Sequence, residues 1–200
     1  MVAAGRGPKV IVVEIKGVTL RLETGSELFS PRAVDRGTLA MLSRVEIGPG
    51  DKVLDLGCGY GVVGILAAKL GRPEQVWMLD NDPLAIRIAT SNAAANDVAG
   101  VHVVQSDGLR ALDEAGFTLI LCNPPYQTDF ATPKHFIEKG FNRLAVGGRL
   151  VMVTKRELWY RRKLAAIFGG VRVEHIDGYV VFEAVRRRAR YANRPALSKT

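Results

Sequence analysis

The chain has 200 residues, of which 48% are hydrophobic and 24% charged, a composition typical of one globular domain. No apolar run approaches the roughly 20 residues of a membrane span, and the start lacks a signal-peptide pattern, so we expect a cytoplasmic protein. The formal net charge is +8, with basic clusters at 155–163 and 186–199. Such clusters favour a polyanionic partner such as nucleic acid, the alternative being a solvated face and tail.

Two strands over 10–15 and 18–24 are predicted to form an N-terminal β-hairpin, followed by a helix over 33–45. Strands and helices then alternate. The expected strands are 52–56, 75–80, 101–105, 117–122, 149–154, 171–176 and 179–185. The expected helices are 62–70, 83–96 with Asp82 as its N-cap, 108–112, 132–144 and 157–168. Repeated βα units predict an α/β fold with a doubly wound, mostly parallel sheet, into which the closing hairpin brings one antiparallel strand. We expect a single domain, with 1–8 and 187–200 as disordered tails.

The two cysteines, Cys58 and Cys122, do not make a disulfide framework, which suggests a reducing compartment. The three histidines are scattered and match no metal-ligand spacing, so no metal is expected. We interpret both cysteines as small packing residues rather than nucleophiles.

Residues 53–64 have the pattern of a strand, a glycine turn and the start of a helix. Glycines let the backbone turn tightly and allow a ligand to lie against it, and the helix N-terminus adds N–H groups. Gly59-x-Gly61-x-x-Gly64, with Asp80 about 20 residues further on, fits the dinucleotide fingerprint. An NAD-dependent enzyme is therefore one alternative.

Two further acids favour a different cofactor. Asp55 precedes the first glycine, where it can meet an amino group, and Asp107 follows the third βα strand, where it can accept the N6 amine of an adenine. Asp80 would hold the ribose hydroxyls in either scheme. Three acids suit a ligand with an adenine, a ribose and a positively charged tail but no phosphate, and S-adenosylmethionine has these parts. Asp107 as a helix-capping residue is the alternative.

The strand at 117–122 ends in Asn123-Pro124-Pro125-Tyr126. The prolines end the strand because they have no N–H for the sheet. The Asn123 side-chain oxygen and the Pro124 carbonyl could accept the two N–H bonds of an exocyclic amine and turn its lone pair toward an electrophile. Tyr126 could stack on the base. The alternative is an ordinary strand end with a Pro-Pro loop.

Taken together and in this order, Asp55-x-Gly57-x-Gly59-x-Gly61, Asp80, Asp107 and Asn123-Pro124-Pro125-Tyr126 resemble the class I S-adenosylmethionine-dependent methyltransferases that act on amino nitrogens. Phe29-Ser30 followed by Asp35-x-Gly37-Thr38 is similar to the catalytic domain of the ribosomal RNA guanine-N2 methyltransferases. The resemblance implies a Rossmann-like, seven-stranded sheet and a guanine amine held at Asn123 and Pro124. The cofactor contacts that we expect are Phe29, Ser30, Asp55, Gly57, Cys58, Gly59, Asp80, Asn81, Asp107, Gly108 and Asn123.

The sequence also departs from that family. In the guanine-N2 family the Asn-Pro-Pro motif is often followed by Phe-His, where this chain has Tyr126-Gln127. Adenine-N6 and protein glutamine-N5 methyltransferases also use Asn-Pro-Pro-Tyr. We therefore predict an N-methyltransferase acting on RNA or a ribosomal subunit, with guanine-N2 of ribosomal RNA first and adenine-N6 second. The expected catalytic residues are Asn123, Pro124, Pro125 and Tyr126. A non-catalytic RNA-binding module on the same scaffold is the alternative from another class.

Overall fold

The computed structural model describes residues 9–28, 30–124 and 130–191. The strands are β1 (Lys9–Ile15), β2 (Val18–Thr24), β3 (Val53–Leu56), β4 (Val76–Asp80), β5 (His102–Gln105), β6 (Phe117–Cys122), β7 (Leu144–Thr154), β8 (Arg172–Ile176) and β9 (Tyr179–Val185). The helices are α1 (Arg36–Leu42), α2 (Val62–Leu70), α3 (Pro83–Ala95), α4 (Ala131–Arg143) and α5 (Glu157–Phe168), with a 3₁₀ turn η1 (Pro73–Gln75). Within these ranges no helix is both long and apolar enough to cross a membrane.

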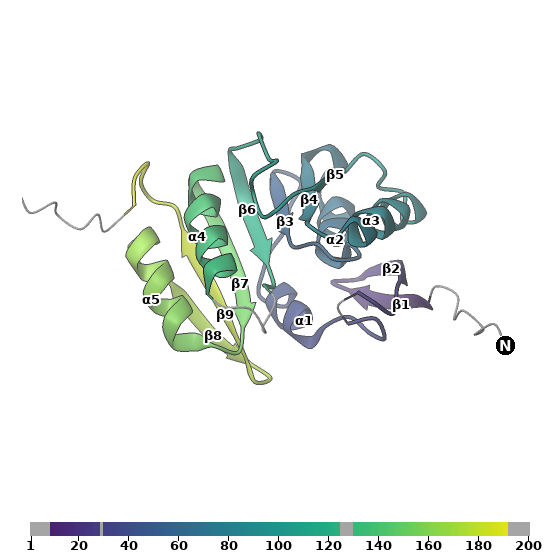
Figure 1. The fold of residues 1–200 in the computed structure, drawn as a ribbon, viewed down its shortest axis with the longest axis horizontal. Helices are drawn as coiled ribbons and strands as arrows, with labels where there is room; N and C mark the ends of the chain where they lie inside the picture. The colour runs from purple at the N-terminus through teal and green to yellow at the C-terminus, as the bar shows by residue number, and fades with distance from the viewer. Residues whose placement is uncertain (1–8, 29, 125–129, 192–200) are drawn as a thin grey trace, which may run out of the picture.

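Seven strands form one sheet in the order β5-β4-β3-β6-β7-β9-β8 (Figure 1). The first five are parallel to one another, and β9 runs antiparallel to both of its neighbours, β7 and β8. Strands β1 and β2 form a separate antiparallel sheet. The predicted α/β fold, with its mostly parallel seven-stranded sheet, one antiparallel strand and N-terminal hairpin, is therefore confirmed.

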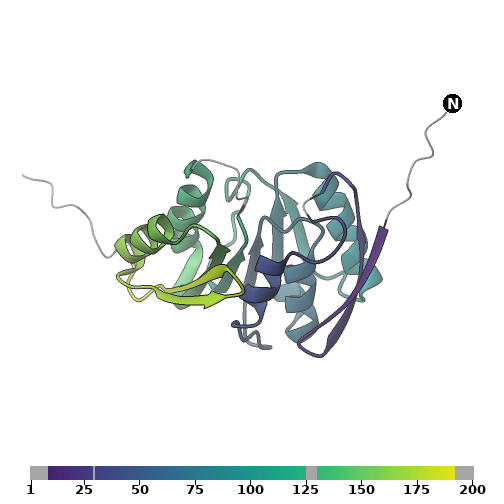
Figure 2. The same cartoon turned by 90° about the horizontal axis from the view of Figure 1, so that it is seen from below.

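Helices cover both faces of the large sheet (Figure 2). Buried side chains of α1, α2, α3 and the β1–β2 hairpin form one core cluster, and those of α4 and α5 form the other. From Leu119 onward, successive residues of β6 belong to opposite clusters: Leu119 and Leu121 face the first, and Ile120 and Cys122 face the second. Phe117, which precedes the register shift with β7, also faces the second. A strand buried on both faces explains why this segment is apolar almost throughout.

Asn92 of α3 and Asn96, the C-cap of this helix, hold the hairpin against the rest of the molecule. Asn92 accepts the N–H of Glu23 at 2.7 Å and donates to the Glu23 carbonyl at 2.8 Å. Asn96 does the same with Arg21, at 3.0 and 2.8 Å. The two amides lie one helical turn apart and satisfy the β2 backbone as a neighbouring strand would. The hairpin is thereby fixed to α3 by the edge of β2.

Three predicted elements differ from the structure by more than one residue. The expected helix at 108–112 is a turn, because Gly108 has φ +61° and only isolated bonds between residues three apart follow it. Helix α1 begins at Arg36 rather than at 33, because the Asp35 carboxylate caps it by accepting the Gly37 N–H at 2.9 Å, and it ends at Leu42 rather than at 45. Strand β7 begins at Leu144, five residues early, and pairs with Phe117 before a register shift. The predicted cap Asp82 is confirmed, with its side chain accepting from Leu84.

Candidate functional site

The site lies where three parallel strands end side by side. Leu56 of β3 is opposite both Leu79 of β4 and Cys122 of β6. The next residues are therefore neighbours at the carboxyl edge of the sheet: Gly57, Asp80 and Asn123. The chain winds outward in opposite directions from β3 and β6, and ligands of doubly wound sheets bind in the crevice at such a point.

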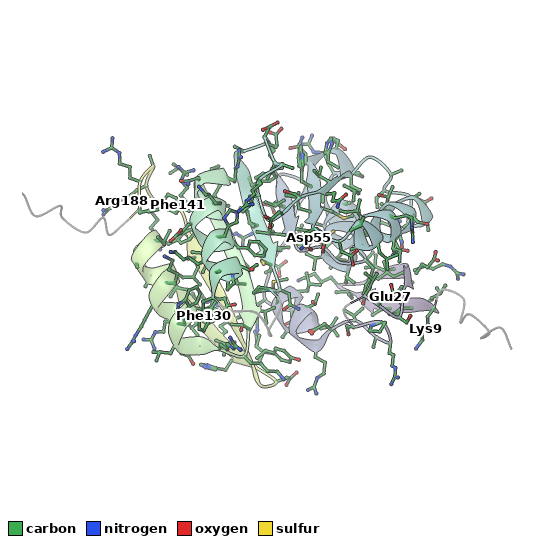
Figure 3. All side chains as sticks on the ribbon, viewed as in Figure 1. Lys9, Glu27, Asp55, Phe130, Phe141 and Arg188 are labelled. Carbon is green, nitrogen blue, oxygen red and sulfur yellow. The ribbon has the colours of Figure 1, made fainter. Side chains whose placement is uncertain are left out.

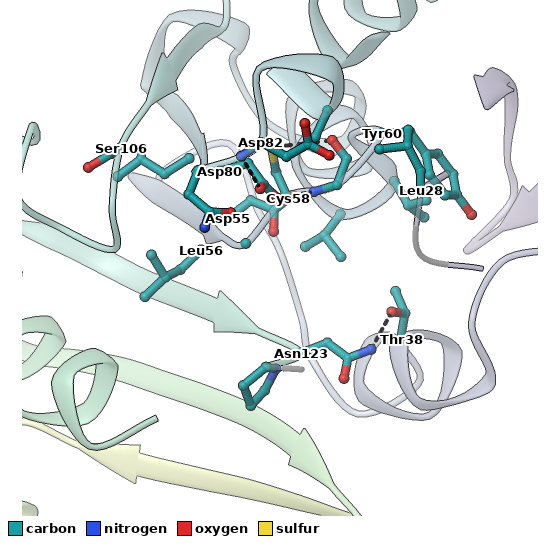
Figure 4. Close-up of a pocket in the computed structure, with 18 of the residues that line it drawn as sticks. Leu28, Thr38, Asp55, Leu56, Cys58, Tyr60, Asp80, Asp82, Ser106 and Asn123 are labelled. Atoms are coloured by element: carbon teal, nitrogen blue, oxygen red, sulfur yellow. Dashed lines mark hydrogen bonds between the residues drawn. The ribbon is translucent and has the colours of Figure 1, made fainter. Parts of the chain in front are cut away.

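A cavity of about 420 Å³ occupies this crevice, a size usual for a small-molecule site (Figure 4). Its lining includes most of the side chains expected from the sequence, namely Ser30, Asp55, Gly57, Cys58, Gly59, Asp80, Asn81, Asp107, Gly108, Asn123 and Pro124. Three expected residues, Phe29, Pro125 and Tyr126, lie outside the described residues. The structure thus brings together segments that span nearly a hundred positions, while the individual roles stay predictions.

The loop after β3 needs its glycines. Gly57, Gly59 and Gly61 have backbone φ angles of +80°, +54° and +97°, which residues other than glycine rarely adopt. Gly64, in the first turn of α2, has an ordinary conformation but no room: a Cβ there would lie 2.3 Å from the Met78 sulfur on β4. The glycine spacing therefore serves a left-handed turn and the close packing of α2 on the sheet.

Asp55 places a carboxylate at the N-terminal turn of α2, the end of a helix at which a dinucleotide's pyrophosphate usually binds. Its Oδ2 accepts the N–H of Gly64, the third residue of α2, at 2.8 Å. The N-terminal N–H groups of a helix are the usual phosphate ligands, and here a carboxylate takes one of them. A pyrophosphate would meet a like charge at this place. The geometry argues against the dinucleotide alternative and favours a ligand with positive charge.

Burial changes the protonation of Asp55. The side chain is buried, and desolvation raises its pKa to about 7, against the opposing effect of the Gly64 hydrogen bond. The nearby Asp80 carboxylate adds a smaller upward effect. A cationic group placed beside Asp55 would favour its charged form.

Asp80 shapes the glycine loop as well as lining the cavity. Its Oδ2 accepts the Gly59 N–H at 2.8 Å and its Oδ1 accepts the Asp82 N–H at 3.0 Å. Asp107 is more exposed and forms an ion pair with Arg110, three residues on, at 2.8 Å. Asp107 does not cap a helix, because the segment after it is a turn.

Asn123 is held in one orientation by α1. Its side-chain nitrogen donates to Thr38 Oγ1 at 3.0 Å and to Asp35 Oδ2 at 3.5 Å, and Figure 4 shows the shorter of these bonds. Because an amide is planar, fixing its nitrogen also fixes the direction of its carbonyl oxygen, away from Thr38. The segment before β3 thus presets the side chain at the end of β6.

Sequence reasoning did not assign several residues that line the cavity. The resemblance included Asp35 and Thr38, but nothing in the sequence indicated that they contact Asn123, more than 80 positions away. The other unassigned lining residues include Glu27, Leu28, Tyr60, Asp82, Ser106, Thr132 and Phe136. Tyr60 lies within the glycine motif and Asp82 was predicted as a helix cap, but neither was assigned to the cavity. The others carry no motif, so only the fold places them there.

Both cysteines are buried and free. Burial raises the pKa of the Cys58 and Cys122 thiols well above the usual range, and the Asp55 carboxylate adds to the effect in each case. Neutral, buried thiols are poor nucleophiles, in agreement with a packing role. In the described part of the chain, no group of three or more His, Cys, Asp or Glu side chains is placed to hold a metal ion.

Comparisons with known proteins agree with this geometry. A family model described as the methyltransferase small domain matches residues 19–183. Ribosomal RNA large subunit methyltransferase G of Shewanella denitrificans is 31% identical over 187 residues, which are 90% of this chain and 49% of that protein. Ribosomal RNA small subunit methyltransferase C of Pseudomonas putida is 30% identical over 179 residues, 87% of this chain and 54% of that protein.

A solved structure is also similar. The T. thermophilus 16S rRNA N2 G1207 methyltransferase, in complex with AdoMet and guanosine, matches with a TM-score of 0.83 and 26% identity. The match covers 90% of this chain and 51% of that one. This chain therefore spans about half the length of the proteins that it resembles.

Proposed function

Since this chain belongs to the methyltransferase small domain family, we propose that it transfers a methyl group from S-adenosylmethionine to the exocyclic N2 amine of a guanine in ribosomal RNA. The observation that carries the proposal is the position of Asn123. Its amide is oriented by Thr38 and Asp35 and lines the same cavity as Asp55 and Asp80. One cavity thus presents both an amine acceptor and a set of carboxylates.

The lining of the cavity fits the cofactor. It contains six acidic side chains, Glu27, Asp35, Asp55, Asp80, Asp82 and Asp107, and among the described residues that line it there is no lysine or arginine. An acidic cavity attracts a cation, and S-adenosylmethionine carries a sulfonium and an ammonium group. Asp55 would face the ammonium, Asp80 the ribose hydroxyls and Asp107 the adenine amine.

When bound, S-adenosylmethionine supplies a methyl group on a positively charged sulfur, which departs as a neutral thioether. The protein's task is then to position the amine. The guanine amine is a poor nucleophile because its lone pair is conjugated with the ring. The Asn123 side-chain oxygen and the Pro124 carbonyl would accept its two N–H bonds and direct the lone pair toward the methyl carbon. No strong general base is required, because the nitrogen becomes acidic once it has been alkylated.

We propose guanine rather than adenine as the target base because of the known proteins that this chain resembles. The T. thermophilus structure is described as an N2 methyltransferase with bound guanosine, and both quoted relatives are named ribosomal RNA methyltransferases. No observation on this cavity favours adenine-N6 or glutamine-N5. The partner is thus proposed to be ribosomal RNA, free or within a subunit, and the cytoplasmic location stays a prediction.

The experiment incubates the purified chain with isotope-labelled S-adenosylmethionine and unmodified ribosomal RNA, then digests the RNA and identifies labelled nucleosides by mass spectrometry. We expect the label in N2-methylguanosine. Label in N6-methyladenosine would replace the proposed base by the adenine alternative. Parallel reactions with ribosomal proteins in place of RNA test the glutamine alternative, which would be supported by labelled protein and unlabelled RNA.

A further inference from the structure

A second cavity lies beside the candidate site, on the surface of α5. It is lined by Phe130, Arg156, Leu158, Trp159, Arg162 and a few neighbours, and we call these five residues the α5 platform. Figure 3 labels Phe130 where the start of α4 meets α5. None of these residues contributes to the cofactor cavity or to the amine site described above.

The aromatic part of the platform is preorganised. The rings of Phe130 and Trp159 stack with centroids 4.4 Å apart and an interplanar angle of 18°. Trp159 also makes an edge contact with Tyr160 at 5.1 Å, and buried Tyr160 in turn stacks on Phe182 at 5.9 Å. The outer pair therefore rests on a buried aromatic layer. Leu158 beside it is 61% exposed and extends the apolar surface of the aromatic pair.

Cations border the aromatic pair. The Arg156 guanidinium lies over the Phe130 ring, 5.4 Å from its centroid, and Arg162 is exposed one turn along α5 from Leu158. The acid in this cavity, Glu157, already contacts His175 at 2.9 Å and Arg161 at 3.8 Å. Lys163 pairs with Glu138, whereas Arg162 makes no ion pair within the described residues. The platform is positively charged overall, with a basic group available for an anion.

The platform adjoins the candidate site through two elements. Strand β7 pairs with β6 so that Met152 is opposite Cys122, which places Arg156 and Asn123 at the same edge of the sheet. Phe130 is the N-cap of α4, and Thr132 of that helix lines the cofactor cavity. A polymer whose reacting unit enters the first cavity therefore has its neighbouring units close to the second.

We propose that the α5 platform is a nucleotide subsite that binds unpaired RNA next to the target guanine, with a base against the Phe130–Trp159 pair and a phosphate at Arg162. Aromatic side chains combined with cations are the usual means of holding single-stranded nucleic acid, because bases present π-faces and phosphates present charge. The combination of exposed Arg162 with the net positive charge of the platform favours a polyanion, and an RNA strand supplies both the charge and the bases. The inference rests on the proposed function, since it places the target guanine at Asn123.

The test uses the full chain with unmodified ribosomal RNA transcribed in vitro, and measures RNA affinity, its salt dependence, cofactor affinity and methyl transfer. Trp159→Ala should weaken RNA binding on the order of 10- to 100-fold, and Trp159→Phe should largely restore it. Arg162→Glu should weaken binding and lower the log–log salt slope by about 0.7. The matched control is Arg87→Glu, the same charge reversal at an exposed position of α3 across the molecule (Figure 1). We expect it to behave as wild type.

Cofactor affinity should be unchanged in every variant, and the loss of transfer should be in KM rather than in kcat. If Trp159→Ala and Arg162→Glu bind RNA as tightly as the control does, the platform is not an RNA subsite. A protein partner would then be the remaining candidate for this surface of α5. Wild-type protein that does not bind the RNA also overturns it. If the platform variants weaken RNA binding but wild type transfers no methyl group, the proposed function fails, and the platform is kept as an RNA-binding surface without a target guanine beside it. If wild type transfers the methyl group and the platform variants bind RNA as tightly as wild type does, the proposed function stands and the subsite fails.

Discussion

At the scale of single residues, buried Asp55 has the most unusual chemistry in the site. Its pKa is raised from 3.8 to about 7 by desolvation. At pH values between these two, Asp55 is protonated in the folded protein and ionised in the unfolded chain. The contribution of Asp55 to the free energy of unfolding of the cofactor-free protein should then fall as pH rises through this window, and level off above about pH 7.

We therefore predict that Asp55→Asn removes this pH dependence. The amide keeps an acceptor for Gly64 but carries no charge, so the variant should gain stability relative to wild type at about pH 8 and differ little at about pH 4. Denaturant unfolding of both proteins across this range measures the effect. The prediction fails if the difference in unfolding free energy between the two is constant with pH.

The same carboxylate links cofactor binding to pH. If Asp55 meets a cationic group, binding should strengthen as the pH rises through about 7, because the ionised form is the one that attracts the ligand. Titration calorimetry with S-adenosylmethionine in buffers of different ionisation enthalpy should detect the proton that binding releases. Asp55→Asn should bind more weakly and release no proton, and an unchanged proton count in this variant would remove Asp55 from the ammonium site.

At the scale of elements, the β1–β2 hairpin and the cofactor loop are joined through α3. Asn92 donates to the Tyr60 carbonyl of the glycine loop at 2.9 Å in addition to its two bonds with Glu23. Asn96, one turn later, binds the hairpin but not the loop. The hairpin leads directly into the segment that carries Leu28, a cavity residue. One buried amide therefore connects both sides of the cofactor cavity.

These two asparagines form a matched pair for an experiment. Asn96→Ala and Asn92→Ala should each destabilise the fold by about 1–3 kcal/mol, because buried backbone groups are left without their partners. Only Asn92→Ala should also weaken binding of S-adenosylmethionine, since only Asn92 touches the glycine loop. Chemical denaturation and calorimetry measure the two effects separately. Equal cofactor affinity in the two variants would mean that the Asn92 bond to the Tyr60 carbonyl does not hold the glycine loop in its binding conformation.

Much of this architecture could be predicted because its signals are local. The glycine turn and the Pro-Pro strand end are encoded within a few residues, and the βα alternation implies one parallel sheet whose carboxyl edge collects the site. The contacts of Asn123 with Thr38 and of Asn92 with Glu23 could not be predicted, because side chains distant in sequence meet only in the folded chain. The helix expected at 108–112 was wrong because a left-handed Gly108 opens a turn there.

At the scale of the whole molecule, charge is segregated. The chain has a net charge of +8, yet six acidic side chains line the cofactor cavity. The excess of basic residues lies elsewhere, on α5 and beyond β9. This distribution allows one molecule to attract a cationic cofactor inward and a polyanion to its surface.

The basic C-terminal segment begins with a structural arginine. Arg186 donates to the carbonyls of Leu144 and Ala189 and lies over the Phe141 ring at 4.8 Å. Tyr191 packs edge-on against the same ring at 4.9 Å and donates to the Glu138 carbonyl at 2.9 Å. A deletion that starts at Arg186 would therefore disturb the fold as well as remove charge.

The role of this segment is better tested by substitution. Changing the exposed Arg187, Arg188 and Arg190 together to glutamine, with Arg186 and Tyr191 kept, should lower the log–log salt slope of RNA binding by roughly 0.7–0.9 for each phosphate that the segment no longer binds. Removal of 192–200 in a second variant tests the remaining basic residues. Unfolding midpoints should match wild type in both. An unchanged slope in both variants would indicate that the segment does not contact the RNA.

The central claim is that Asn123 positions the amine for methyl transfer, and single-turnover kinetics test it most directly. Wild type and Asn123→Ala are loaded with S-adenosylmethionine and mixed with unmodified ribosomal RNA, and cofactor affinity is measured separately. The substitution removes one acceptor and leaves the glycine loop and the carboxylates of Asp55 and Asp80 in place. Cofactor affinity should therefore fall far less than the transfer rate, which should drop by ~10²–10³. Transfer by Asn123→Ala at the wild-type rate would contradict the account and place the chemistry elsewhere in the protein.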